Sequence, residues 1–368
     1  MRRLPIVFAA TAALTGAGIA SADLAPITTF GDNGWLKPSN LATVPYAYLS
    51  TGNTERGLSY NPVTGNVLLV SRQNVGGIDA NIRILNPLTG ADIGGLDVTT
   101  GVVPAGGTFK VNAIDVGADG AIYVGNLSTA ANSNFKVYRW ANESAPATLA
   151  YDGLTGLART GDSFAATGSG SSTVLAAAGS NNVTASNFAV LATTDGLNYT
   201  STAYTSVPGT STATNDYRLG LTFVDNDTLI GNQGTNARVT DFAATANVVD
   251  SIPLGAAQRA IDYAVIDGIP FIAVIDSNSS LVQVLDITTP SAPILYDQLN
   301  LTSGLLAANG NGNGTGAVAW GAITGDSATL YAMNTNQGIQ AFTFKVPEPT
   351  TLGALALAAG GLMLRRRQ

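Results

Sequence analysis

The stretch AIDVGADGAIYVGNLSTAANSNFKVYRW (residues 113–140) contains three short apolar runs that are separated by residues typical of turns. The runs cover residues 113–116, 121–124 and 136–140, and an Asp-Gly pair joins the first two. Short runs rich in Val, Ile, Tyr and Trp between clusters of Gly, Asn, Asp and Ser predict β-strands, and Asp-Gly is a strong hairpin signal. The stretch therefore predicts three antiparallel strands that follow one another in the chain.

The same order of strands recurs six times along the chain. Each unit opens with a short run in which a small residue or Asp lies among apolar residues. The six opening runs are residues 57–60, 113–116, 163–166, 220–223, 260–263 and 317–320. A turn, two stronger strands and, in the first five units, a looser fourth strand follow each opening run. Repeats of about 40 to 57 residues suit a four-stranded unit, so the sequence predicts an all-β fold, a six-bladed β-propeller.

The ring needs one strand from elsewhere, because the sixth unit has no fourth strand of its own. Two β-like segments remain upstream of the first unit, at residues 24–30 and 44–49. A closed ring hides both sheet edges, so we expect an N-terminal strand, residues 44–49, to complete the last blade. The units resemble blades of NHL or WD-repeat propellers in pattern alone, since no Trp-Asp pair ends the third strands. Seven blades, or a pair of β-sandwiches, are the alternatives.

The N-terminus has the parts of a secretory signal peptide. Arg2 and Arg3 form a basic start, and an apolar, Ala-rich run follows. Ala20 and Ala22 then supply the small residues of a cleavage site for signal peptidase. Residues 1–22 are therefore predicted to form a signal helix that is removed, and the mature protein is expected to work outside the cytoplasmic membrane.

The C-terminal segment VPEPTTLGALALAAGGLMLRRRQ (residues 346–368) forms a tail of three parts. These are the rigid tripeptide Pro347-Glu348-Pro349, an apolar run at residues 352–364 and a basic end at Arg365, Arg366 and Arg367. Proline keeps the first part extended, the apolar run can lie in lipid only as a helix, and the arginines favour the cytoplasmic side. A helix of about 24 Å is short for a hydrocarbon core of about 30 Å. The tail predicts a transient, processed membrane anchor, with an ordinary anchor helix as the alternative.

This tail resembles the PEP-CTERM sorting signal, in which an exosortase, a membrane-embedded cysteine protease, cuts near the Pro-Glu-Pro tripeptide. The resemblance covers only the tail. It implies that exosortase is a partner during export and that the C-terminal helix contacts the membrane transiently. It also implies delivery to the cell envelope, outer surface or extracellular matrix of a Gram-negative-type bacterium, and a link to exopolysaccharide and biofilm production.

Composition narrows the function classes. Of the 17 basic residues five lie in the two terminal segments, as does one of the 24 acidic residues, which leaves residues 23–345, the predicted propeller domain, with a net charge of −11. Such a domain has no basic stripe for nucleic acid. The chain has no Cys and no His, which excludes a Ser-His-Asp triad and imidazole metal sites. Cations, neutral glycans and proteins are the more plausible ligands.

Candidate ligand-binding residues lie where the inner strands of a propeller begin and run along its channel. The predicted set is Arg56, Asn112, Asp115, Arg218, Arg259 and Asp262, with Asp162 and Thr315 at equivalent starting positions. A ring that mixes Arg, Asn and Asp can hold a sugar, a carboxylate or a cation. The alternative is a solvated or mutually paired channel lining, because a propeller fold by itself says little about function.

Calcium is a further expectation, with Asp225 and Asp227 as candidate ligands and Asp115 with Asp119 as a second pair. Asp also favours turns through bonds to its own backbone, which is the competing interpretation. We therefore expect no obligatory cofactor and a non-catalytic exported surface or matrix protein that binds exopolysaccharide or another envelope protein. The alternative is a calcium-dependent carbohydrate-active or lactonase-like enzyme that uses Asp115 and Asp262 as paired carboxylates.

Overall fold

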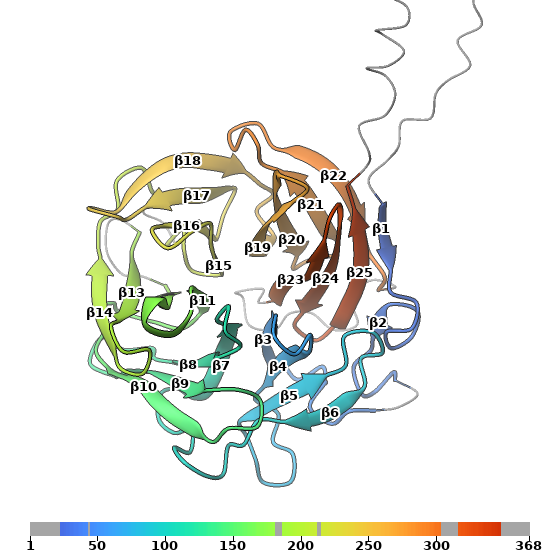
Figure 1. The fold of residues 1–368 in the computed structure, drawn as a ribbon, viewed down its shortest axis with the longest axis horizontal. Helices are drawn as coiled ribbons and strands as arrows, with labels where there is room; N and C mark the ends of the chain where they lie inside the picture. Colours follow the sequence, from blue (N-terminus) through green and yellow to red (C-terminus); the bar gives the residue numbers. More distant parts are fainter. Residues whose placement is uncertain (1–22, 43–44, 181–185, 212–214, 303–315, 347–368) are drawn as a thin grey trace, which may run out of the picture.

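The computed structural model describes residues 23–42, 45–180, 186–211, 215–302 and 316–346. These residues form six β-sheets arranged as a ring around a central channel, which is a six-bladed β-propeller (Figure 1). The prediction of six blades is confirmed, and the seven-bladed and sandwich alternatives are wrong. Within the described ranges, the only helical element is a 3-10 turn at Gly170–Ser172, and no helix there is long and apolar enough to cross a membrane. The predicted signal helix and C-terminal helix lie outside these ranges.

The first three blades follow the predicted units closely. Blade 1 comprises β3 (Glu55–Tyr60), β4 (Val67–Ser71), β5 (Asn81–Leu85) and β6 (Asp92–Gly95). Blade 2 comprises β7 (Phe109–Val116), β8 (Ile122–Leu127), β9 (Phe135–Trp140) and β10 (Ala147–Gly153). Blade 3 comprises β11 (Ser163–Thr167), β12 (Val174–Ala178), β13 (Phe188–Thr193) and β14 (Tyr199–Tyr204). In each blade the strands pair in antiparallel sequence order, with the first strand nearest the channel (Figure 1).

The next blades repeat the plan. Blade 4 comprises β15 (Gly220–Phe223), β16 (Thr228–Asn232), β17 (Asn236–Asp241) and β18 (Asn247–Pro253). Blade 5 comprises β19 (Gln258–Ile266), β20 (Ile269–Asp276), β21 (Val282–Asp286) and β22 (Ile294–Leu299). Blade 6 takes only three strands from the C-terminal side: β23 (Gly316–Thr324), β24 (Ser327–Asn334) and β25 (Gly338–Lys345).

The N-terminal segment closes the ring, but not through the strand that we expected. β1 (Asp23–Pro26) pairs antiparallel with β25, and β2 (Trp35–Leu36) pairs with the other end of β25. Closure by an N-terminal strand is confirmed, whereas the choice of residues 44–49 is wrong: residue 44 is not described, and residues 45–49 belong to no strand. Pro45 cannot donate a ladder hydrogen bond, and the amide of Leu49 bonds to the carbonyl of Tyr46 in a local turn.

The hydrophobic core lies between the blades. Each of six buried clusters joins two neighbouring blades. One of them joins blade 6 to blade 1 and to the N-terminal segment. A second strand such as β4 is covered on both faces, so Val67–Ser71 is buried throughout and reads as a continuous apolar run. Each inner strand contacts the inner strand of the next blade, and β23 contacts β3, which closes the circle.

The sequence pattern of the inner strands in blades 1–3 recurs in blades 4–6. Blades 1 and 4 carry Gly-Leu-Ser-Tyr and Gly-Leu-Thr-Phe, blades 2 and 5 carry Ala-Ile-Asp-Val and Ala-Ile-Asp-Tyr, and blades 3 and 6 share an alanine at the third position. Gly57 and Gly220 open the first pair. A side chain at either position would meet the next blade, at Ile114 and Arg259 respectively. Close approach of neighbouring inner strands therefore requires glycine at these two places.

Candidate functional site

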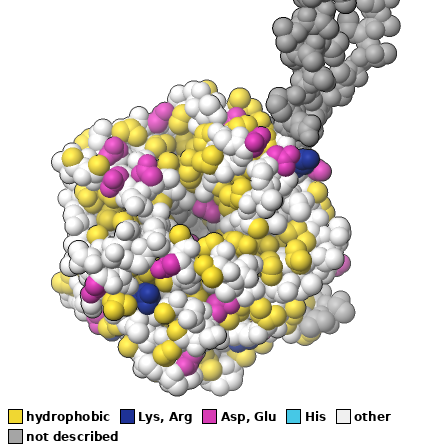
Figure 2. Space-filling model, in the orientation of Figure 1, with side chains coloured by type: hydrophobic (Ala, Val, Ile, Leu, Met, Phe, Trp, Pro, Cys, Tyr) yellow, Lys and Arg dark blue, Asp and Glu magenta, His cyan; other side chains and the backbone are white. Residues whose placement is uncertain are grey.

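The centre of the ring is a hollow of about 460 Å³ that is lined by residues of all six inner strands. Figure 2 shows this hollow from one face of the ring, where acidic side chains are more frequent than basic ones. Of the predicted residues, Arg56, Asp115 and Asp262 line the hollow, as does Asp162. The inner strands therefore bring part of the predicted set together.

Asp115 links three blades through its carboxylate. Its Oδ1 accepts hydrogen bonds from the hydroxyl of Ser59 in blade 1 (2.8 Å) and from the amide of Val116 (2.9 Å). Its Oδ2 accepts a bond from the amide of Ala166 in blade 3 (2.7 Å). A charged acceptor makes strong hydrogen bonds, so Asp115 holds the inner strand of its own blade to those on both sides.

Asp262 makes the equivalent contacts in the other half of the ring. Its Oδ1 accepts bonds from the hydroxyl of Thr222 in blade 4 (2.9 Å) and from the amide of Tyr263 (2.9 Å). Its Oδ2 accepts a bond from the amide of Trp320 in blade 6 (2.8 Å). We call these two three-blade linkages together the carboxylate belt.

The belt carboxylates are partly exposed to the channel, yet protein surrounds them closely. Loss of hydration raises the pKa of Asp115 above its usual range. The same burial, with a smaller contribution from the charge of Asp115, raises the pKa of Asp262 to about 7. Asp262 therefore exchanges a proton near neutral pH, while three donors fix the orientation of each carboxylate.

A second cluster lies where the inner strands begin. Here the carboxylate of Asp162 pairs with Arg159 through two bonds of 2.5 and 2.6 Å, and with Nε of Arg218 at 3.5 Å. Arg56 donates from Nη2 to the carbonyl of Asn53 (2.7 Å). Together with Arg72, which follows β4, these residues form a cluster that we call the arginine mouth: Arg56, Arg72, Arg159 and Arg218 around Asp162.

Burial and neighbouring charges shift the pKa values of two arginines in the arginine mouth. Burial lowers the pKa of Arg56, although Glu55 and Asp162 act in the opposite direction. Burial and then the charge of Arg56 lower the pKa of Arg72 to about 8. Burial also raises the pKa of the Glu55 carboxyl itself. Glu55 and Asp162 are thus the counter-charges that act on Arg56, and Asp162 also pairs with Arg159 and Arg218.

Sequence reasoning missed Arg72 and Arg159. A signal was present: β4 runs antiparallel to β3, and Ser71 pairs with Glu55, so Arg72 must lie beside the start of β3. Arg159 precedes the inner strand of blade 3 by only a few residues. The residue that follows the second strand of blade 1 is Arg72, so a comparison of the residues that follow each second strand identifies it.

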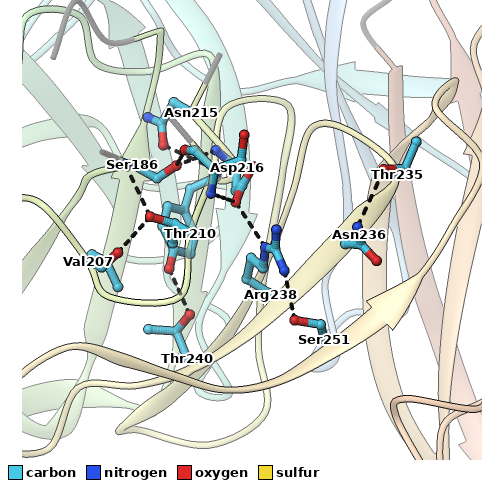
Figure 3. A network of polar contacts seen from close by, with 12 residues as sticks. Ser186, Val207, Thr210, Asn215, Asp216, Thr235, Asn236, Arg238, Thr240 and Ser251 are labelled. Atoms are coloured by element: carbon cyan, nitrogen blue, oxygen red, sulfur yellow. Dashed lines mark hydrogen bonds and ion pairs between the residues drawn. The ribbon is translucent and has the colours of Figure 1, made fainter. Parts of the chain in front are cut away.

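A network of buried polar contacts holds the segment that leads to Arg218 (Figure 3). The side-chain amide of Asn215 donates to the backbone carbonyl of Asn187 (2.9 Å). The carboxylate of Asp216 accepts bonds from Nε of Arg238 (2.9 Å) and from the amide of Ser211 (2.7 Å). These contacts fix the chain between blades 3 and 4 and thereby place Arg218 beside Asp162, although Arg218 itself does not line the central hollow.

The other predicted residues occupy different surroundings. Asn112 is buried, and its side-chain amide donates to the carbonyl of Gly161 in the next blade. Arg259 donates from Nε to the carbonyl of Ala256 (3.4 Å), and burial, followed by the charge of Arg218, lowers its pKa. Neither lines the central hollow, and Thr315 lies outside the described residues.

The candidate calcium ligands take part in turns. Oδ1 of Asp225 accepts a bond from the amide of Asp227 (2.9 Å) in the hairpin between β15 and β16. Asp119 accepts bonds from the amides of Ala121 (3.2 Å) and Gly170 (2.9 Å). In the part of the chain that the structure describes, no three Asp, Glu, His or Cys side chains gather as a metal-binding group. These bonds agree with the turn-forming interpretation of the aspartates.

Comparison with a protein-family model decides the nature of the C-terminal tail, because residues 345–367 match the PEP-CTERM protein-sorting motif. The chain carries a PEP-CTERM tail. This confirms the expectation drawn from the Pro-Glu-Pro tripeptide, and it identifies the protein as one that is exported and processed by exosortase. No curated protein matches the chain.

Comparison with solved structures finds similarity at low sequence identity. A DUF4623 family protein from Bacteroides eggerthii is 19% identical with a TM-score of 0.60, over 80% of this chain and 71% of that one. The WD40 β-propeller domain of Doa1 is 12% identical with a TM-score of 0.47, over 80% of each chain. The Malassezia sympodialis allergen Mala s 1 is 11% identical with a TM-score of 0.46, over 80% of this chain and 92% of that one. The first of these shares the fold of this chain over most of its length.

Proposed function

We propose that the mature protein is a non-catalytic binding protein of the cell surface or extracellular matrix of a Gram-negative-type bacterium. Signal peptidase and exosortase process it during export, and it binds exopolysaccharide or another envelope protein. The PEP-CTERM tail supports the route. The ligand class is inferred from the channel and its surroundings, because fold similarity alone does not identify a function.

One observation carries the non-catalytic part of the proposal. The two channel carboxylates that could serve as an acid–base pair, Asp115 and Asp262, each accept two hydrogen bonds from the inner strands of neighbouring blades and a third from the next residue of their own strand. A catalytic carboxylate must offer an oxygen to substrate or water. The bonds of both carboxylates orient them to join blades, which supports a structural role for them and a binding role for the channel entrance.

Cell fractionation tests the route and destination. The full chain is produced in a bacterium that has an exosortase, alongside a variant in which Pro347, Glu348 and Pro349 are replaced by Ala. We expect the wild type to reach the outer surface or the medium in a shortened form and the variant to stay unshortened in the membrane fraction. Equal processing and distribution of both forms would contradict the proposal.

One observation favours a second candidate, a carbohydrate-active or lactonase-like enzyme. The pKa of Asp262, raised by burial to about 7, lies in the range of a general acid–base catalyst. Incubating the exported protein with panels of polysaccharides and lactones, with and without calcium, separates the two functions. Turnover that Asp262→Asn abolishes would establish the enzyme, whereas binding without turnover supports our proposal.

A further inference from the structure

A second hollow of about 560 Å³ adjoins the arginine mouth. It lies between blades 1 and 2, and we call it the interblade groove. Arg56 and Arg72 line it from blade 1, and residues 106–110 line it from blade 2. Arg56 also lines the central hollow, so the groove and the channel entrance share one wall. Its volume is in the range of about 300 to 1,000 Å³ that is usual for small-molecule sites.

The walls of this groove are held in place. The amide of Asn53 donates to the side-chain oxygen of Asn336 in blade 6 (2.7 Å), and the side chain of Asn336 donates back to that of Asn53 (2.8 Å). On the opposite wall, Gly107 has a positive φ of 70°, and an added side chain would meet Leu127 and Asn126. The groove is therefore a built feature that keeps its shape without a ligand.

Arginine and aromatic surfaces meet inside the groove. The guanidinium carbon of Arg72 lies 3.5 Å from the centre of the Phe109 ring, and its Nε donates to the carbonyl of Val111 (3.3 Å). Phe109 is nevertheless 41% exposed. Lys110 adds a further cation, which pairs with Asp79 at 2.9 Å on the surface. A ligand here meets positive charge and an open aromatic surface together.

The charge balance of this region favours a negative ligand. Within a domain of strongly negative net charge, four guanidinium groups gather near the carboxylates of Asp162 and Glu55. Burial chiefly, and then the charges of Arg56 and Arg159, lower the pKa of Arg72 to about 8. An anion brought among these groups relieves the repulsion, and guanidinium groups bind carboxylates through paired hydrogen bonds.

We infer that the interblade groove and the arginine mouth bind a carboxylated sugar chain. Carboxylates of successive sugar units would meet Arg72 and then the arginines at the channel, while the apolar face of a sugar ring packs on Phe109. Arginines on several blades require a ligand with repeated anionic groups, and the exposed ring favours a sugar over a flexible acidic peptide. This inference rests on the proposed binding function and specifies its ligand class.

Isothermal titration with polygalacturonate tests the inference on the exported protein, with neutral dextran and poly-glutamate as comparison polymers. We expect polygalacturonate to bind, more weakly as salt rises, and the comparison polymers to bind at least about tenfold more weakly. Arg72→Gln should lower the affinity about tenfold, and the exposed Lys110→Gln about twofold. Arg83→Gln, which alters another half-buried arginine of blade 1 outside both hollows, should leave the affinity unchanged.

The outcomes separate this inference from the proposed function. No binding of polygalacturonate, equal binding of poly-glutamate, or unchanged affinity in both Arg72→Gln and Lys110→Gln would overturn the inference. Binding of dextran alone would overturn it too, while leaving the proposed binding function intact. Cleavage of polygalacturonate, seen as new reducing ends, would instead contradict the non-catalytic function and still support the ligand class. Melting temperatures of each variant show whether a loss of affinity reflects unfolding.

Discussion

The carboxylate belt spans all six inner strands, whereas the arginine mouth gathers residues near the starts of the inner strands of blades 1, 3 and 4, together with Arg72, which follows β4. In the belt each contact of blades 1–3 has a counterpart in blades 4–6, with Asp115 answered by Asp262. At the mouth the counterparts differ: Arg56 corresponds to Leu219, and Asp162 corresponds to Gly316. The repeated residues join neighbouring blades, which is required in both halves of the ring. The residues that differ between the two halves indicate a local function at the arginine mouth.

Removing a belt carboxylate should have the largest effect on stability. Asp115→Ala leaves the amide of Ala166 and the hydroxyl of Ser59 without their acceptor, so we expect the free energy of unfolding to fall by about 3 kcal/mol. Urea titration followed by fluorescence measures it. Asp152→Ala is the control, because it removes an exposed carboxylate of the same blade and should cost less than about 1 kcal/mol. Equal losses of unfolding free energy in the two variants would show that the belt carboxylate contributes no more to stability than an exposed carboxylate.

The raised pKa of Asp262 predicts a pH dependence of stability. The folded protein holds this proton up to a pH of about 7, whereas the unfolded chain loses it near about 3.9. Between these values the folded state binds more protons, so this group makes stability fall as pH rises, by up to about 1.4 kcal/mol per pH unit. Above about pH 7 its contribution stays constant.

Urea unfolding of wild type and Asp262→Asn at pH 5 and pH 8 measures this contribution. The variant cannot titrate at this position, so its stability should change less between the two pH values than that of the wild type. Parallel pH profiles for the two proteins would mean that Asp262 is ionised throughout this range in the folded state.

The hydroxyl donors of the belt test its twofold repeat. Ser59→Ala and Thr222→Ala each remove one donor and leave two amide donors on the carboxylate, so each should cost about 1 kcal/mol. Thermal unfolding of both variants compares the two halves. A loss confined to one variant would show that the halves, although alike in geometry, differ in energy.

Calcium should have the smallest effect. Asp225 uses its carboxylate to close its own turn, so we expect millimolar calcium to move the melting temperature by less than about 1 °C. Differential scanning calorimetry with calcium and with chelator measures the shift. A rise of several degrees that Asp225→Asn abolishes would establish a calcium site in this hairpin.

Much of the fold could be predicted because each blade carries its own local signals. Strands such as Val67–Ser71 are apolar throughout, and turns with Gly, Asn or Asp separate them. The closing strand was not predictable in this way, since closure depends on which segment reaches the free edge of β25. Tyr48 and Leu49 are buried as expected of apolar residues, but they pack in a turn. Hydrophobicity predicted their burial and could not predict strand pairing.

The site was partly predictable for the same reason. Asp115 and Asp262 stand out within apolar runs, and both face the channel. Their partners Ser59 and Thr222 belong to runs that the repeat had already aligned, so the period of three blades was legible in the sequence. Arg72 was overlooked, because its place beside β3 depends on pairing across a hairpin and is seen only when the residues that follow each second strand are compared with the starts of the inner strands.

The most direct test of the contrast between belt and mouth is to measure polygalacturonate affinity and melting temperature together for Asp115→Asn and Arg72→Gln. We predict that Asp115→Asn melts several degrees lower than the wild type and binds polygalacturonate within about twofold of wild-type affinity. Arg72→Gln should keep its melting temperature within a few degrees of the wild type and lose about tenfold in affinity. The opposite assignment, with Asp115→Asn stable but unable to bind and Arg72→Gln unstable but still binding, would contradict it.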